Sequence, residues 1–185
     1  MSFTQRRDIG LLALRLGVGS VLIANGSQKL FGWFGGGGIR GTTEAMDQMG
    51  FIPPRESAIA SGVGETASGT LLALGFATPV AGAAAAGAMS GAVSVHAPAG
   101  FFSHSGGFEH PALVGLVAAA LGVTGPGRYS LDHFTEHTLD RPAVLMAAFA
   151  LSAAAATVVV SRRIAVLAER SGVGATDADN GAATA

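Results

Sequence analysis

Apolar segments of helical length, separated by short polar or glycine-rich stretches, dominate the chain. Most are close to the ~20 residues that an α-helix needs to cross the hydrocarbon core of a bilayer. We expect membrane-spanning helices over residues 9–34, 58–76, 78–96, 108–123 and 142–160. The pattern therefore predicts an all-α integral membrane protein, built as a four-helix transmembrane bundle plus an additional C-terminal transmembrane helix.

The stretch after the first apolar segment predicts an extramembrane loop. The glycines at 35–38 interrupt the first helix, and Thr42 or Thr43 can cap a short amphipathic helix that Gly50 ends. The apolar side chains of this loop either line the entrance of a cofactor site or, as we favour, rest on the bundle at headgroup level. They are Met46, Met49 and Phe51.

Small residues recur every four positions in the second and third segments. This spacing allows helices to approach closely in lipid, and the short connection between the two segments predicts an antiparallel pair. We therefore expect close helix packing along two rows, formed by Ala60, Gly64 and Ser68 and by Ala83, Gly87 and Gly91.

The composition divides the chain into four parts. They are a cytoplasmic N-terminus (1–8), a four-helix membrane domain (9–132), a linker with the extra transmembrane helix (133–163) and a disordered tail (164–185). Arg6 and Arg7 favour the cytoplasmic N-terminus, which leaves the loop between His96 and His110 outside. Five spans then export the arginines that follow residue 160, against the positive-inside tendency. We expect a multi-pass protein of the plasma membrane.

Composition and charge exclude several classes of function. Hydrophobic residues make up 49% of the chain and charged residues only 12%, too few for the surface of a soluble domain. The net charge of -1 and the lack of basic runs exclude nucleic-acid binding. The chain has no cysteine, so it cannot form disulfides or use thiol chemistry. Any redox role therefore needs another electron carrier.

Four polar residues inside the apolar segments are candidates for a buried site. Arg15, Asn25 and Lys29 fall on one face of the first helix, and Glu65 lies within the second segment. Because charges facing lipid are costly, these side chains are expected to point into protein, although Lys29 is near enough to the helix end to reach the interface instead. The expected partner of Glu65 is Arg15 or Lys29. A structural ion pair and an acid that handles protons or ligand are equally good interpretations of Glu65.

A histidine-rich loop offers a weaker metal hypothesis. Imidazole and carboxylate groups suit zinc or iron, but the spacing matches no compact ligand pattern, and glycines separate the groups. We favour interface histidines that bond to water and backbone, and predict no metal site. The residues concerned are His96, His104, Glu109 and His110.

Five motifs, in the order in which they occur along the chain, resemble those of the DoxX family of small membrane proteins. They are RLGVGSVLIANGSQKLFGWFGG, MDQMGFIPP, GVGETASGTLLALGFATP, VHAPAGFFSHSGGFEHPAL and GPGRYSLD. The resemblance implies that residues 9–132 form a DoxX-like four-helix bundle, related to the DoxD-type subunit of thiosulfate:quinone oxidoreductase and associated with redox or detoxifying partners. Carried over by position, the motif residues are Arg15, Asn25, Lys29, Glu65, His96, Glu109 and Arg128.

Three functional hypotheses follow. The first is a membrane subunit of a redox system, a component of an oxidoreductase that handles quinone or a small sulfur or oxygen species, with Arg15, Glu65 and His96 bounding a quinone site. Its partners would be the bilayer, a redox enzyme and further copies of the chain. The second is a non-catalytic membrane anchor or assembly protein, and the third is a small-solute transporter.

Overall fold

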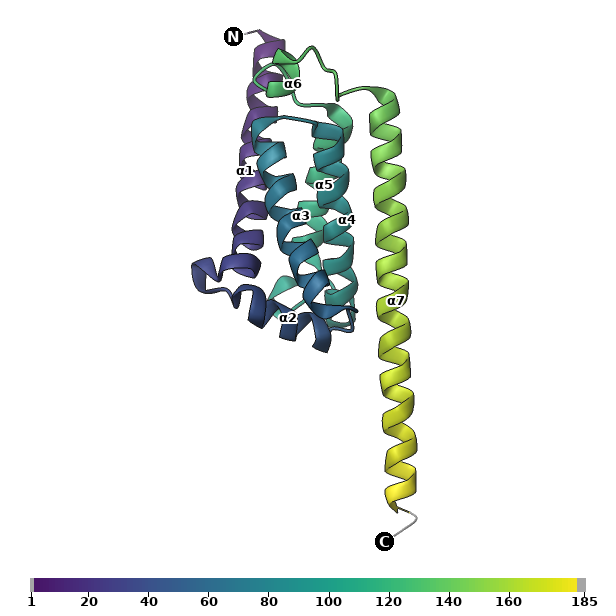
Figure 1. Ribbon diagram of the computed structural model, residues 1–185. Helices are drawn as coiled ribbons and strands as arrows, with labels where there is room; N and C mark the ends of the chain where they lie inside the picture. Colours follow the sequence, from purple (N-terminus) through teal and green to yellow (C-terminus); the bar gives the residue numbers. More distant parts are fainter. Residues whose placement is uncertain (1, 183–185) are drawn as a thin grey trace.

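The computed structural model describes residues 2–182, with side chains through Gly172. Every regular element in this part of the chain is helical. Four helices pack as an antiparallel bundle, and a fifth stands beside it (Figure 1). The bundle helices are α1 (Phe3–Phe31), α3 (Pro54–Leu74), α4 (Thr78–His96) and α5 (Glu109–Thr124), and the fifth is α7 (Pro142–Ala182).

Shorter helices lie at the two ends of the bundle. A 3-10 turn (Trp33–Gly35) and α2 (Gly38–Gln48) connect α1 to α3, and two further 3-10 turns (Ala97–Ala99 and Ser103–Ser105) connect α4 to α5 at the same end. The four-residue α6 (Leu131–Phe134) lies at the opposite end, near the N-terminus (Figure 1). We call these two ends of the bundle the α2 end and the α6 end.

Local sequence explains where α1 and α3 begin and end. Ser2 and Gln5 form a reciprocal capping box that begins α1, and Gly32 ends the helix with a φ of 73°. Helix α3 starts at Pro54, where the missing backbone N–H costs nothing, and ends at Gly75 with a φ of 63°. The observed helices agree with the predicted apolar segments within four residues at each end, except that α1 begins six residues earlier, at Phe3, and α7 is longer.

Backbone contact between glycines holds α1 against α3. A Cβ added to Gly19 would lie 2.6 Å from the carbonyl oxygen of Gly69, and one added to Gly26 would lie 2.6 Å from that of Gly62. Larger residues would separate these helices. Around this contact, leucines of α1, α3 and α5 pack with small residues of α4 to form the buried core, which includes Leu11, Leu22, Leu72, Ala81, Ala85 and Leu121.

The predicted rows of small residues are only partly packed. Ser68 and Ala83 are buried, and Gly87 contacts Ser152 of α7. The expectation is wrong for Gly64 and Gly91, because a Cβ added at either would have nothing within 4 Å. A row of small side chains can allow close packing or leave open space, and the spacing alone does not distinguish these outcomes.

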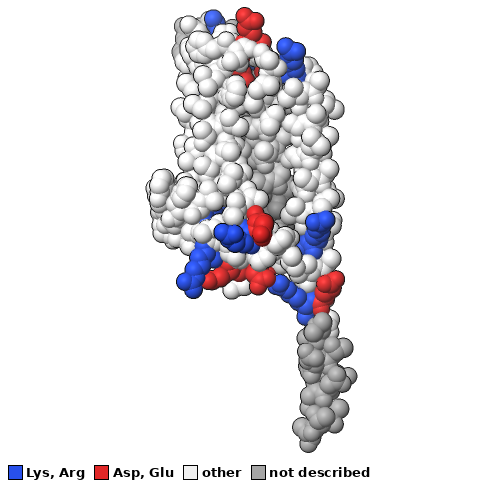
Figure 2. Space-filling model, viewed as in Figure 1, with Lys and Arg blue, Asp and Glu red and all other residues white. Residues whose placement is uncertain are grey.

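The surface of the bundle is suited to lipid. Charged side chains gather at the two ends, and the band between them is almost free of charge on the face shown in Figure 2. Three helical stretches are long and apolar enough to cross a membrane, Phe3–Phe31, Thr78–Ala99 and Pro142–Gly172, and α5 is apolar but shorter. These features confirm an all-helical membrane fold. The count of five crossings and the cytoplasmic N-terminus stay predictions.

Helix α7 changes the expected C-terminal boundary. We expected residues 164–185 to form a disordered tail, but the helix continues to Ala182, and residues 183–185 lie outside the described part of the chain. The stretch from Ser161 to Arg170 contains no glycine or proline, so nothing in it stops the helix that begins at Pro142.

Candidate functional site

An ion pair between α1 and α3 lies at the centre of the candidate site. Lys29 Nζ donates to Glu65 Oε1 and, at 2.9 Å, to Ser61 Oγ. The side chain of Glu65 is 3% exposed and that of Lys29 is 29% exposed. Of the two partners expected for Glu65, the structure therefore selects Lys29, which turns inward instead of reaching for the interface.

Only one carboxylate oxygen of Glu65 is satisfied by this pair. Glu65 Oε2 is buried and accepts no hydrogen bond from the described residues. A buried oxygen without a partner is costly in a packed protein. Oε2 therefore keeps an unused capacity to accept a hydrogen bond.

Glu65 and Lys29 line a cavity of about 980 Å³ between α2, α3, α4 and α7. The face between the bundle and α7 is visibly hollowed in Figure 2. Ala60 and Gly64 of α3 and Ala84, Ala88 and Gly91 of α4 leave this space open. Polar side chains also contribute to the lining, namely Lys29, Thr42, Ser57, Ser61, Glu65, His96 and Ser152.

The apolar residues of the α2 loop have both of the roles considered for them. Met46 and Phe51 are buried in a small cluster with Ala58, against which Met49 packs. The same methionines and Phe51 also line the cavity at its α2 end. They rest on the bundle and at the same time form part of the cavity wall.

Arg15 lies at the α6 end and does not line this cavity. Its guanidinium donates to the carbonyl oxygens of Ala73 at 3.3 Å, Tyr129 at 2.7 Å and Pro126. Asp132 adds a favourable electrostatic interaction. The structure therefore does not bring Arg15 together with Glu65 and His96, because α1 carries Arg15 and Lys29 toward opposite ends of the bundle.

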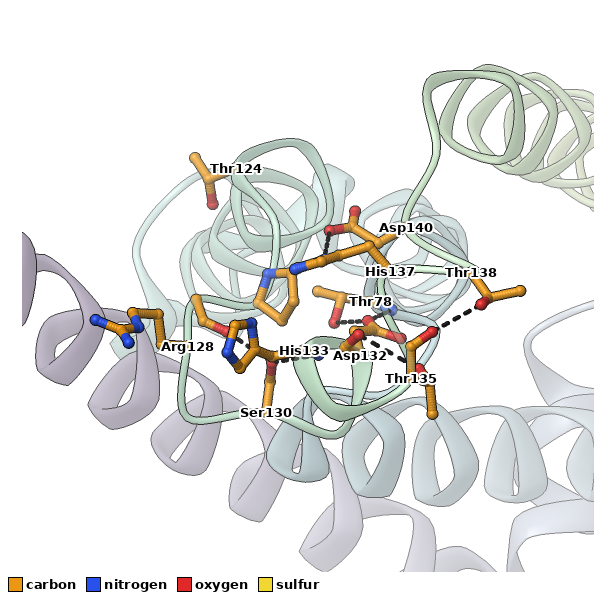
Figure 3. Close-up of polar contacts among 12 residues, drawn as sticks. Thr78, Thr124, Arg128, Ser130, Asp132, His133, Thr135, His137, Thr138 and Asp140 are labelled. Atoms are coloured by element: carbon orange, nitrogen blue, oxygen red, sulfur yellow. Dashed lines mark hydrogen bonds and ion pairs between the residues drawn. The ribbon is translucent and has the colours of Figure 1, made fainter.

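Asp132 organises the α6 end and was missed as a site residue in the sequence. It is fully buried, and its carboxylate accepts hydrogen bonds from Ala77 N at 2.8 Å, Thr78 N at 3.0 Å and Thr78 Oγ1 at 2.8 Å. Figure 3 shows Asp132 beside Thr78, with the His137–Asp140 contact nearby. Asp132 caps α4 from 54 residues away along the chain, and this distance hides it from a local sequence pattern.

The other candidate residues have local structural contacts or lie outside the cavity. His96 Nδ1 is 2.8 Å from the carbonyl oxygen of Gly106, in line with the backbone role that we favoured for it. Glu109 Oε2 accepts from Ser103 N at 3.1 Å. Asn25 is half-buried and does not line the cavity.

The remaining histidines and Arg128 are exposed. The ring of His104 lies beside that of Phe102, and His110 is at the start of α5. Arg128 donates its backbone N–H to Asp8 Oδ1 at 3.3 Å. Among the described residues, no group of three or more metal-binding side chains is close enough to hold an ion.

Comparison with known proteins gives the family. Searches of curated proteins and of solved structures found no match. Residues 10–98 match the profile of the DoxX family. These residues cover α1 from Gly10 onward and all of α2, α3 and α4, and with them both Lys29 and Glu65. The chain therefore belongs to the DoxX family of membrane proteins.

Proposed function

We propose that this protein is the membrane subunit of a redox system and that its cavity binds the head group of a quinone. The observation that carries the proposal is Glu65, which lines a cavity of ligand size with one oxygen paired and the other without a protein partner. Membership of a membrane family supports it further, because quinones reside in the bilayer.

The cavity offers both kinds of group that a quinone and its reduced quinol require. Quinone carbonyl oxygens accept hydrogen bonds, which Lys29 Nζ can donate. The neutral His96 ring, whose Nδ1–H donates to the Gly106 carbonyl oxygen, leaves Nε2 as an acceptor for a quinol hydroxyl. Quinol hydroxyls donate hydrogen bonds, and Glu65 Oε2 is free to accept one. The proposed head-group site therefore consists of Lys29, Glu65 and His96. Lys29 has the role that we had expected for Arg15.

Reduction of a quinone takes up protons as well as electrons. Glu65 and His96 are acids and bases that can transfer protons at the cavity wall. The electrons would come from a partner enzyme, because the sequence has no cysteine and no dinucleotide fingerprint. The partner is therefore a redox enzyme, and this chain contributes to the oxidoreductase by binding the quinone that accepts the electrons.

A quinone titration tests this proposal. The purified protein in lipid nanodiscs is titrated with ubiquinone-2, and binding is followed by native mass spectrometry. We expect Glu65→Gln to weaken binding about tenfold, which corresponds to one hydrogen bond to a charged group. The matched control is Glu56→Gln, because Glu56 is an exposed carboxylate on the same helix that does not line the cavity.

If wild type and Glu65→Gln bind ubiquinone-2 equally well, the quinone does not bind at Glu65. Failure of the wild type to bind any ubiquinone-2 would favour the anchor or transporter hypotheses. Partner capture and solute flux in liposomes would then separate those two.

A further inference from the structure

Helix α7 forms one entire wall of the cavity. Its contribution comes from a single helical face, formed by Ala148, Leu151, Ser152, Ala155, Ala156 and Val159. None of these residues falls within the stretch that matches the family profile. The cavity is therefore completed by a segment that lies beyond the matched domain.

Specific polar contacts fix α7 in this position. Ser152 Oγ donates to the carbonyl oxygen of Ala83 at 2.6 Å, in the half of α4 nearer α6. Toward the α2 end, Arg163 Nη1 donates to the carbonyl oxygen of Ser94 at 3.2 Å, and its guanidinium lies 5.7 Å from the ring centroid of Phe51. These contacts join α7 to the bundle at two levels, so the wall is a built part of the structure.

Arg170 adds a third contact. Its guanidinium reaches Asp47 at the end of α2, at 2.8 Å from Oδ1 and 2.7 Å from the carbonyl oxygen. Asp47 belongs to the loop that closes the cavity at this end. Helix α7 is thus tied to the same loop that carries Met46 and Met49.

The cavity is longer than a quinone ring requires. Its α4 wall runs from Val80 to His96, a rise of about 24 Å at ~1.5 Å per residue. The polar groups of α3 and α4 lie between Ser57 and Glu65 and at His96, so they occupy the half of the cavity nearer α2. The half nearer α6 is apolar apart from Ser152, whose hydroxyl is already bonded to α4.

A cavity with one polar half and one apolar half fits an amphiphile with a polar head and a long apolar chain. We propose that the apolar half, between α4 and α7, holds the isoprenoid tail of the quinone, and that α7 makes the site selective for long-tailed quinones. This inference rests on the proposed function for the identity of the head group. The tail site itself depends only on the apolar half of the cavity and on α7.

The test compares ubiquinones that share a ring and differ in tail length. Ubiquinone-0, ubiquinone-2 and ubiquinone-4 are titrated into nanodiscs that hold the full chain, with concentrations expressed per lipid to correct for partition into the bilayer. We expect affinity to rise at least tenfold from ubiquinone-0 to ubiquinone-4. Ala155→Phe should abolish this rise, because Ala155 is an exposed residue on the cavity wall and a ring there occupies the space of the tail.

The neighbouring position provides a matched control. Ala154 is also exposed on α7 but does not line the cavity, so Ala154→Phe should keep the full dependence on tail length. Ala84→Leu is a second filling variant, because Ala84 is exposed on the α4 wall in the half of the cavity nearer α6. Ala120→Leu on α5 is its control, since Ala120 is also exposed but does not line the cavity.

The outcomes separate the tail site from the head-group site. Binding that depends on Glu65 but not on tail length would overturn the tail site and leave the proposed function intact. A tail effect that is equal in wild type and Ala155→Phe would also overturn it. If long-chain alcohols show the same dependence on chain length and on Ala155 while quinones bind no better, the tail site stands and the quinone proposal fails.

Discussion

Buried charges are the costliest residues in this fold, and each is compensated in a different way. Arg15 is 1% exposed and donates to three backbone carbonyls, whereas Glu65 depends mainly on Lys29. An isolated charge in an apolar interior costs several kcal/mol, so these partners are needed for the fold. Each of the two still has one buried atom without a partner among the described residues, Arg15 Nε and Glu65 Oε2.

At the scale of single residues, we predict that Lys29→Met lowers the free energy of unfolding by about 2 kcal/mol. The variant leaves the Glu65 carboxylate uncompensated, and the cost falls below the ~3–5 kcal/mol of a fully buried pair because Lys29 is 29% exposed. Thermal unfolding in detergent measures the change. The double variant Lys29→Met/Glu65→Leu should recover most of it, since both charges are then gone.

Arg40→Met is the control for this prediction. The contact between Arg40 and Glu44 also joins a base and a carboxylate, but both side chains are exposed, so its loss should not change the unfolding temperature measurably. If Lys29→Met has no larger effect than Arg40→Met, the pair with Glu65 does not contribute to stability.

At the scale of the element, the start of α4 depends on a residue outside the helix. Ala77 precedes α4 with a φ of 47°, and no side chain of its own segment caps the first turn. Asp132 supplies the cap, and its own backbone N–H donates to the carbonyl oxygen of Gly75 at 2.8 Å. The α3–α4 turn and α6 therefore hold each other in place.

We predict that Asp132→Ala destabilises the protein by about 1–3 kcal/mol, because it leaves buried N–H groups of the α4 terminus without an acceptor. Asp132→Asn should lose less, since asparagine is a good N-cap residue. Asp140→Ala, which removes a more exposed contact with His137, is the control. Thermal unfolding ranks the variants, and equal effects of Asp132→Ala and Asp140→Ala would contradict the capping role.

The predictable part of the structure follows from local patterns. Apolar segments gave the helices, and the positions of Glu65 and Lys29 on their helices limited the partners of Glu65 to two residues. The cavity could not be predicted, because it depends on where α7 docks. The same limit explains the error for Gly64 and Gly91, which face open space rather than a neighbouring helix.

At the scale of the whole molecule, the position of α7 bears on the membrane orientation. A cytoplasmic N-terminus places the α2 end outside, together with Arg163 and Arg170, against the positive-inside tendency. In the structure Arg163 contacts the Ser94 carbonyl and the Phe51 ring, and Arg170 pairs with Asp47. These contacts hold both arginines at the α2 end. They therefore lie on the side of the membrane that the α2 end occupies.

The absence of native cysteine makes the orientation directly testable. Because the α2 and α6 ends lie on opposite sides of the bundle, single cysteines in Ser2→Cys and Glu136→Cys should react with a membrane-impermeant maleimide from one side. Ser105→Cys and Glu169→Cys should react from the other, since α7 runs from the α6 end past α2 (Figure 1). In intact cells we expect the second pair to be labelled, which follows from Arg6 and Arg7. Labelling of Glu169→Cys together with Ser2→Cys would mean that α7 does not cross the membrane, and the cavity would then lack its proposed wall.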